Sequence, residues 1–393
     1  MTKKVRMTLY VVSLVVTFIV LVLLIFNEKL LKTTGSQSVN QSTNQSAGSQ
    51  ISTENTEDNL GDNGAKDETQ PSQSGNENGT RGESTTIIFA GDVLIATAME
   101  RYYDSEGISR LVSEKLLTEM VDADICMVNN EFQFSDRGTP MEDKQFTFQT
   151  DPKYVQILKD MGVDIVSLAN NHSLDFGTEA LQDTFATLDN AGILYAGAGD
   201  TRERAEALQV IEVNGQKFGF LAATRVIPVS QWNVEFRQPG LFATYDDTRL
   251  IECIEAAKAE CDFLTVYVHW GIEREAYPQD YQTAIAKRCF EAGANLVIGA
   301  HPHVLQGIEF IEDKPVFYSL GNYIFAQTIA RTALVKVEVQ ADGEATYSLI
   351  PAFAKDGQTK VFEGVEAEAL FNYMNEISPK AFIDEVGNVY DTE

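Results

Sequence analysis

The stretch ANLVIGAHPH, residues 294–303, decides the fold of this 393-residue chain. It is a short apolar run that ends in a glycine and two histidines, as a buried β-strand followed by a polar loop would. Other runs of the same design are TTIIFAGD (85–92), DICMVNNE (124–131), VDIVSLANNH (163–172), DFLTVYVHWG (262–271) and PVFYSLGN (315–322). Because helical patterns separate these runs, the sequence predicts an α/β domain.

Helices and hairpins are expected between and after these runs. Apolar residues at three- and four-residue spacing predict helices over residues 108–121, 152–161, 178–191, 246–259, 278–292 and 366–377. Asn214-Gly215 and Asp342-Gly343 each separate two strand-like segments and predict β-hairpins. Part of the sheet structure is therefore expected to be antiparallel.

The histidines are the clearest indication of a functional site. All four of them, His172, His269, His301 and His303, lie at the ends of strand-like runs. One such histidine would most simply be a hydrogen-bonded structural residue. Four at equivalent places predict a shared metal or catalytic site, because ligands of open α/β sheets bind outside the carboxyl ends of the strands.

Oxygen ligands follow from the same strand ends. Asp92 and Glu131 come directly after apolar runs, where a buried charge is costly unless a metal or another cation compensates it. Asn171 offers a neutral carbonyl oxygen. A set of nitrogen and oxygen ligands without thiolate predicts one or two divalent ions, Mn²⁺, Fe²⁺ or Zn²⁺.

These motifs, in this order, resemble the poly-γ-glutamate capsule biosynthesis family called CapA, which is similar to the calcineurin-like metallophosphoesterases. The resemblance covers residues 87–325 and implies a four-layer α-β-β-α sandwich. It rests on Gly91-Asp92, Asn130-Glu131, Asn170-Asn171-His172 with Asp175 and Gly177, His269-Trp270-Gly271 with Glu273, GAHPH (299–303) and SLGN (319–322).

The resemblance also implies roles for individual residues. The implied metal ligands are Asp92, Glu131, Asn171, His269, His301 and His303. His172 resembles the proton donor near the scissile bond, and Asp175 joins it in the catalytic set. Leu94 stands where the family usually has a histidine, and Glu131 replaces an aspartate, so one of two metal positions lacks a ligand. Glu273, Asp175 and Asn322 are candidate replacements.

An anionic ligand needs positive side chains near this site. Arg225 and Arg274 are the predicted substrate contacts, together with Glu273 and Asn322, and Arg137 and Lys144 are further cationic candidates. The polar loop 132–148 follows Glu131 directly. It is either a lid that faces the substrate or a plain surface connection.

The N-terminal part predicts a membrane location. Residues 7–26 are apolar and long enough to span a bilayer, and the basic residues before them favour a cytosolic N-terminus. We interpret residues 1–34 as a signal anchor, with a cleaved signal peptide as the alternative. Residues 35–83, rich in Ser, Asn, Gln and acids, predict a disordered tether.

Residues 84–330 would be the metallophosphoesterase-like domain, with a hairpin and a helix from residues 331–393 packed on it. A single-pass cell-membrane protein with an extracellular domain is the expected result.

Composition excludes other classes of protein. The chain has 30 Lys and Arg against 58 Asp and Glu, a net charge of −28, which argues against a nucleic-acid partner. Its four cysteines form no CxxC pair, so we expect small buried core residues rather than a disulfide scaffold or a zinc site.

Three functions remain open from the sequence. The first is a membrane-anchored component of poly-γ-glutamate synthesis or export, with a metal-dependent hydrolase- or transferase-like site. The second is a non-catalytic partner that binds the nascent polymer or a membrane synthetase. The third is a stand-alone extracellular phosphoesterase. The four histidines at the strand ends favour a working metal site. Leu94, which stands where the family usually has a histidine, indicates that this site lacks one ligand.

Overall fold

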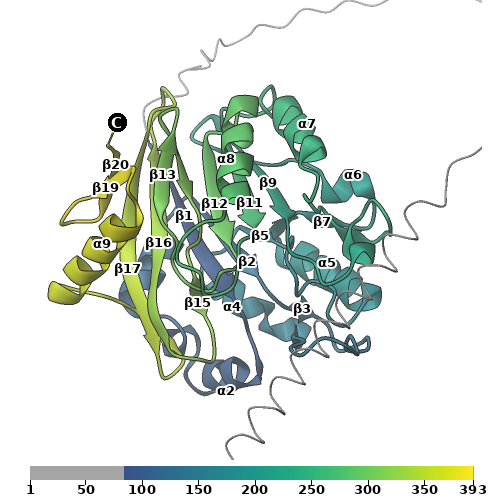
Figure 1. Ribbon diagram of the computed structural model, residues 1–393. Coiled ribbons are helices and arrows are strands. Elements are labelled where there is room, and N and C mark those ends of the chain that lie inside the picture. Colours follow the sequence, from purple (N-terminus) through teal and green to yellow (C-terminus); the bar gives the residue numbers. More distant parts are fainter. Residues whose placement is uncertain (1–83, 393) are drawn as a thin grey trace, which may run out of the picture. The chain divides into compact units, whose positions relative to one another are not determined.

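The computed structural model describes residues 84–392, and they contain two β-sheets with helices on their outer faces (Figure 1). The predicted signal anchor and tether lie outside the described residues. Within residues 84–392, no helix combines the length and the apolar character that a membrane crossing requires.

The larger sheet has ten strands, with the order β19-β20-β17-β16-β1-β2-β5-β6, and with β15 and β18 paired to β1 and β17. Strands β1, β2, β5 and β6 run parallel, and β16 runs antiparallel to β1. Its strands are β1 (Thr85–Val93), β2 (Ile125–Asn130), β5 (Ile165–Ser167), β6 (Leu194–Ala196), β15 (Asn322–Ile324), β16 (Ile329–Val339), β17 (Ala345–Lys355), β18 (Gln358–Val361), β19 (Ala381–Ile383) and β20 (Asn388–Asp391).

The second sheet has six strands in the order β13-β14-β12-β11-β9-β8, of which β9, β11, β12 and β14 are parallel. They are β8 (Gln209–Val213), β9 (Gln216–Thr224), β11 (Phe263–His269), β12 (Leu296–Ala300), β13 (Ile308–Ile311) and β14 (Lys314–Phe317). Two short pairs complete the strands: β3 (Gln133–Phe134) with β4 (Gln149–Thr150), and β7 (Ala198–Gly199) with β10 (Gly240–Leu241).

The two sheets face each other across a shared apolar core. Phe89 and Met127 of the larger sheet and Phe220, Tyr267 and Ile298 of the second sheet are fully buried in it. Since side chains of a strand alternate between its faces, the neighbouring residues build two further cores on the outer faces.

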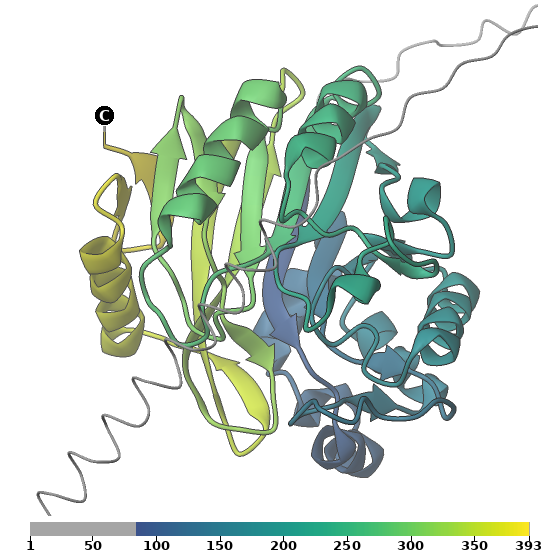
Figure 2. The same ribbon diagram turned by 45° about the vertical axis from the view of Figure 1, so that its right-hand side comes forward.

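Helices cover those outer faces and complete an α-β-β-α arrangement. On the larger sheet lie α2 (Thr97–Glu106), α3 (Glu114–Val121), α4 (Val155–Asp160) and α5 (Thr178–Ala191). On the second sheet lie α7 (Thr248–Ala257) and α8 (Asp280–Ala292), the two green helices in front of the green strands in Figure 2. The mixed α/β fold expected from the sequence is confirmed.

Both predicted hairpins are present, as β8-β9 and β16-β17. The helix expected over residues 108–121 is divided, because Ser113 has an extended backbone between a 3₁₀ turn at Ile108–Arg110 and α3. The sequence analysis missed α2, whose only buried residue is Met99, and the short α6 (Arg202–Ala205).

Residues 331–392 are an integral part of this fold. Strand β16 lies directly beside β1 inside the larger sheet. The C-terminal helix α9 (Val365–Ile377) buries Phe371 and Met374 against the core between the sheets. The structure therefore places this segment next to the strand that carries Asp92.

Candidate metal centre

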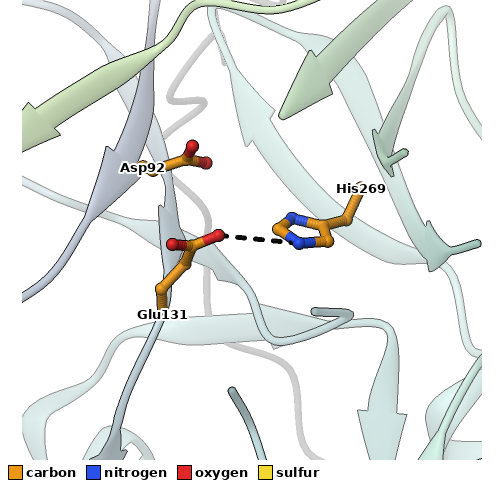
Figure 3. A group of neighbouring side chains, drawn as sticks. All are labelled: Asp92, Glu131 and His269. Carbon is orange, nitrogen blue, oxygen red and sulfur yellow. Dashed lines mark ion pairs between the residues drawn. The ribbon is translucent and has the colours of Figure 1, made fainter. Parts of the chain in front are cut away.

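The ends of three strands bring Asp92, Glu131 and His269 together (Figure 3). Asp92 lies near the end of β1, Glu131 follows β2, and His269 ends β11 of the opposite sheet. One ligand atom from each lies within 4.8 Å of the others, and Glu131 Oε1 is 3.6 Å from His269 Nε2. All three side chains are buried, so they form a compact site that water reaches poorly.

A glycine before Asp92 permits the close packing at this strand end. A Cβ atom at Gly91 would lie 1.9 Å from the carbonyl oxygen of Gly321, which no side chain can accommodate. The amide of Asp92 donates to that same carbonyl at 2.9 Å. Asn322, next in the chain, is therefore aligned with Asp92 in the β1-β15 pair.

Asn129 connects the three candidate ligands. Its Nδ2 atom donates to Asp92 Oδ1 at 2.8 Å and to Glu131 Oε1 at 3.1 Å, and lies 3.2 Å from His269 Nδ1. The sequence analysis did not select it. The available signal was its position two residues before Glu131, which places both side chains on the same side of an extended chain.

The two carboxylates of the site are buried close to each other, which disfavours their charge. Burial, followed by the negative charge of Asp92, raises the pKa of Glu131 well above its ordinary value. Burial, followed by the neighbouring histidines, lowers the pKa of His269 well below its ordinary value. Two buried acids beside a neutral imidazole form an environment that favours a bound cation.

His301 and His303 follow β12 and extend the site. Both have left-handed backbones, with φ of 97° and 61°, a conformation that costs about 1–3 kcal/mol in a residue other than glycine. The ring of His301 lies 4.7 Å from that of His269, centre to centre. Burial lowers the pKa of His301 to about 4, and its buried Nδ1 atom has no hydrogen-bond partner among the described residues.

The pKa of His303 is shifted in the opposite direction to that of His301. Its Nδ1 atom lies 2.7 Å from Asn322 Oδ1 and 3.2 Å from Asp92 Oδ2. Burial alone would lower the pKa of His303, but the contact with Asp92 and the charge of Glu131 outweigh it and raise the pKa to about 10. Asp92 Oδ2 is a buried atom whose contact among the described residues is this ion pair with His303.

His172 and Asp175 form a buried pair beside the centre. His172 Nδ1 lies 2.8 Å from Asp175 Oδ2, and the ammonium of Lys144 contacts both Asp175 and the carbonyl oxygen of Asn171. Burial is the main cause that lowers the pKa of His172, and Asp175 opposes it. Asn171 Oδ1 lies 2.9 Å from His269 Nε2, which links this pair to the centre.

The described residues fit a divalent metal ion. The donors are carboxylate oxygens, an amide oxygen and imidazole nitrogens, as expected for Mn²⁺, Fe²⁺ or Zn²⁺. His301 Nδ1 and Asp92 Oδ2 are buried atoms without a hydrogen bond among the described residues, so both suit a metal ion as ligands. Leu94 is 4% exposed within the apolar core, so that position supplies no ligand.

A cavity of about 630 Å³ adjoins the centre. Its lining includes His172, His303, Asn322, Glu273 and Arg274, and also Phe146 and Phe148 from the polar loop 132–148. The structure thus brings the predicted ligands, the catalytic pair and most of the predicted substrate contacts to one place.

Arg225 is the exception among the predicted substrate contacts. Its guanidinium donates to the carbonyl oxygens of Thr244 at 3.1 Å and Tyr245 at 2.8 Å. It also lies over the ring of Tyr281, 4.6 Å from its centre. Arg225 is not part of the cavity lining, so the geometry assigns it to supporting the nearby loop.

The chain is similar to known proteins in sequence and in structure. Capsule biosynthesis protein CapA of Bacillus anthracis is 28% identical over 290 residues, which cover 71% of this chain and 69% of that protein. PGA biosynthesis protein CapA of Bacillus subtilis (strain 168) is 29% identical over 270 residues, covering 67% and 70%. A solved structure of a hypothetical protein from Thermus thermophilus covers 69% of this chain and 99% of its own, with 17% identity and a TM-score of 0.42.

The family match includes all the residues of the candidate centre. The model of the family described as bacterial capsule synthesis protein PGA_cap matches residues 86–327. This range begins in β1 and ends after β15, and so contains the strand ends that carry the ligands. The chain belongs to the bacterial capsule synthesis protein PGA_cap family.

Proposed function

We propose that this protein is a metal-dependent hydrolase or transferase of poly-γ-glutamate capsule synthesis or export, acting on the polymer or on an intermediate of it. The names of the similar Bacillus proteins support the polymer, and the family supports the capsule. The observation that carries the catalytic part is the buried convergence of Asp92, Glu131 and His269. Two buried acids this close together disfavour each other's charge, and a bound divalent ion would relieve that repulsion.

Asp92, Glu131 and His269 would hold the first metal ion, with Asn171, His301 and His303 as further ligands. When bound there, a divalent metal supplies Lewis acidity toward a carbonyl or phosphoryl oxygen and lowers the pKa of water. Asn129 orients both carboxylates through its hydrogen bonds, which is how groups behind the ligands commonly tune a metal site.

His172 would transfer the proton. His172 would donate from its Nδ1 atom to Asp175, which leaves the Nε2 atom for the substrate, although the ammonium of Lys144 also lies 3.1 Å from Nδ1. His172 also lines the cavity, within reach of a ligand there. The arrangement of an imidazole held by a carboxylate is typical of general acid–base catalysis.

Two variants of the full-length chain separate catalysis from assembly. His269→Ala is expected to lose both metal and activity, whereas His172→Ala is expected to keep the metal and lose about 10²–10⁴-fold in activity. Polymer production in cells and cleavage of purified poly-γ-glutamate are the measurements. Full activity of a folded His172→Ala variant would contradict the catalytic proposal and favour a role as a non-catalytic partner of a membrane synthetase.

We also propose that residues 7–26 anchor the protein in the cell membrane and that the acidic domain lies outside the cell, next to the membrane synthetase. The length of the apolar stretch and the basic residues before it support this. Protease added to intact cells is then expected to release the domain by cutting within residues 35–83. A mature N-terminus beyond residue 33 would contradict the anchor.

A further inference from the structure

Two arginines in the cavity have no acidic partner. Arg274 and Arg331 both line it, and no ion pair among residues 84–392 involves either guanidinium. Of the other nine arginines among the described residues, four are in ion pairs: Arg137, Arg202, Arg249 and Arg288. Between residues 84 and 393 the chain has 49 acidic and 23 basic residues, so two arginines without an acidic partner at one cavity make it a candidate site for an anionic ligand.

A β-bulge turns Arg331 toward the cavity. Ile329 pairs with Ala354 and Thr332 with Ala352, so β16 has one more residue than β17 over this interval. The extra residue breaks the alternation, and Ala330 and Arg331 are both exposed and both line the cavity. Bulges of this kind redirect a side chain and often lie next to active sites.

Tyr373 of α9 supports the redirected arginine through its ring. The guanidinium carbon of Arg331 lies 4.0 Å from the centre of the Tyr373 ring, a cation–π contact. Tyr373 also lines the cavity. A stacked guanidinium keeps its hydrogen-bond donors at the edge, where they can bind a carboxylate with two parallel hydrogen bonds.

Arg274 is held near the histidines by its backbone. It has φ of 66°, an uncommon value for arginine, and its amide donates to the carbonyl oxygen of Pro302 at 2.8 Å. Pro302 lies between His301 and His303, so Arg274 is tied to the segment that carries two candidate ligands. Glu273 beside it lines the same cavity, together with His172 and His303.

We propose that Arg274 and Arg331 form a groove that binds successive carboxylates of a γ-linked glutamate chain, with Arg331 and Tyr373 as a second carboxylate subsite away from the metal centre. This inference rests on the proposed function for the identity of the chain. Each γ-glutamyl unit has one free carboxylate and two methylene groups. Phe146, Phe148 and Phe325 in the cavity wall suit the methylene groups. Arg331 and Tyr373 lie outside residues 86–327, so the family match does not assign this subsite.

The test is binding of fluorescently labelled γ-linked glutamate oligomers to the purified full-length chain, with a chelator present to prevent turnover. An octamer is expected to bind more tightly than a dimer. Arg331→Gln is expected to weaken octamer binding about tenfold and leave dimer binding unchanged, since it removes one charged subsite. Arg274→Gln is expected to weaken both. Higher salt is expected to reduce the difference between octamer and dimer.

Arg110→Gln is the matched control, because Arg110 also lies over a tyrosine ring, 4.1 Å from the centre of Tyr102, but does not line the cavity. If Arg331→Gln does not fold, Tyr373→Leu tests the same subsite, because it removes the ring over which Arg331 lies. Equal affinity for dimer and octamer, or unchanged octamer binding in a folded Arg331→Gln or Tyr373→Leu variant, would overturn the groove. Absence of metal or of turnover in the unmodified chain would contradict only the proposed function, because binding is measured without either.

Discussion

His172 Nδ1 lies 2.8 Å from Asp175 Oδ2, three residues further along the chain, and both side chains are buried. The local turn fixes this contact: the amide of His172 donates to Asn170 Oδ1 at 3.0 Å, and Asp175 accepts a second hydrogen bond from the amide of Phe148 at 2.8 Å. The imidazole is therefore held in one orientation, in which the carboxylate of Asp175 and the ammonium of Lys144, 3.1 Å away, both face its Nδ1 atom.

Asp175→Asn is expected to retain the fold and the metal and to lower activity about 10²-fold or more. The carboxylate raises the pKa of His172, so its removal lowers that pKa further. If protonated His172 is the acid, activity falls above this pKa, and the alkaline limb of the pH–rate profile is expected to move to lower pH. Asp183→Asn is the control, because Asp183 pairs with exposed Arg137 outside the cavity lining. An unchanged profile would show that Asp175 does not act through His172.

Lys144→Gln is expected to have the opposite effect on the same profile. The positive charge of Lys144 lowers the pKa of His172, so the neutral variant is expected to raise it and move the alkaline limb to higher pH. The same substitution removes the ammonium that contacts Asp175 and the carbonyl oxygen of Asn171. If the alkaline limb moves in the same direction in Asp175→Asn and in Lys144→Gln, this electrostatic explanation is wrong.

Asn129→Ala is expected to weaken metal binding about 10–100-fold, the usual effect of removing a group that orients ligands. It takes away the donor shared by Asp92 and Glu131. Asn375→Ala is a matched control, since Asn375 also makes two side-chain hydrogen bonds, both to Ile383, in the C-terminal part of the chain. Competition with a metal-binding dye measures the affinity, and equal losses in the two variants would indicate a general effect on folding.

Chelation of the metal is expected to destabilise the chain. A ligand that binds only the folded state adds about 2.7 kcal/mol to the free energy of unfolding at a concentration one hundred times its Kd. Without metal, Asp92 and Glu131 remain buried close together, where each carboxylate disfavours the charge of the other. Unfolding by urea with and without chelator measures the difference, which is expected to vanish in His269→Ala. A difference that persists in that variant would place the metal elsewhere.

The sequence predicts the strands and their polar ends because both depend on local patterns. The run at 262–271 has the β-branched residues of a strand and the histidine that ends it, and β11 ends at His269 as expected. Asn129 escaped prediction because an asparagine within a strand has no chemical pattern of its own. Its role depends on Asp92 and His269, which reach it only through the pairing of strands distant in the chain.

Long-range geometry also explains the other differences. Arg225 is close to His269 through its backbone, with its amide donating to the carbonyl oxygen of His269 at 2.8 Å, yet its side chain turns to a neighbouring loop. Arg331 joins the cavity through a bulge and a contact with Tyr373, and neither feature has a signal in the local sequence.

The metal content of the full-length chain, measured by mass spectrometry after purification, tests the central claim most directly. We predict one or two divalent ions of Mn, Fe or Zn per chain, loss of these ions in His269→Ala, and their retention in His172→Ala. A folded, unmodified chain that binds none of these metals when they are supplied in excess, or a His269→Ala variant that binds them as well as the unmodified chain, would contradict the account.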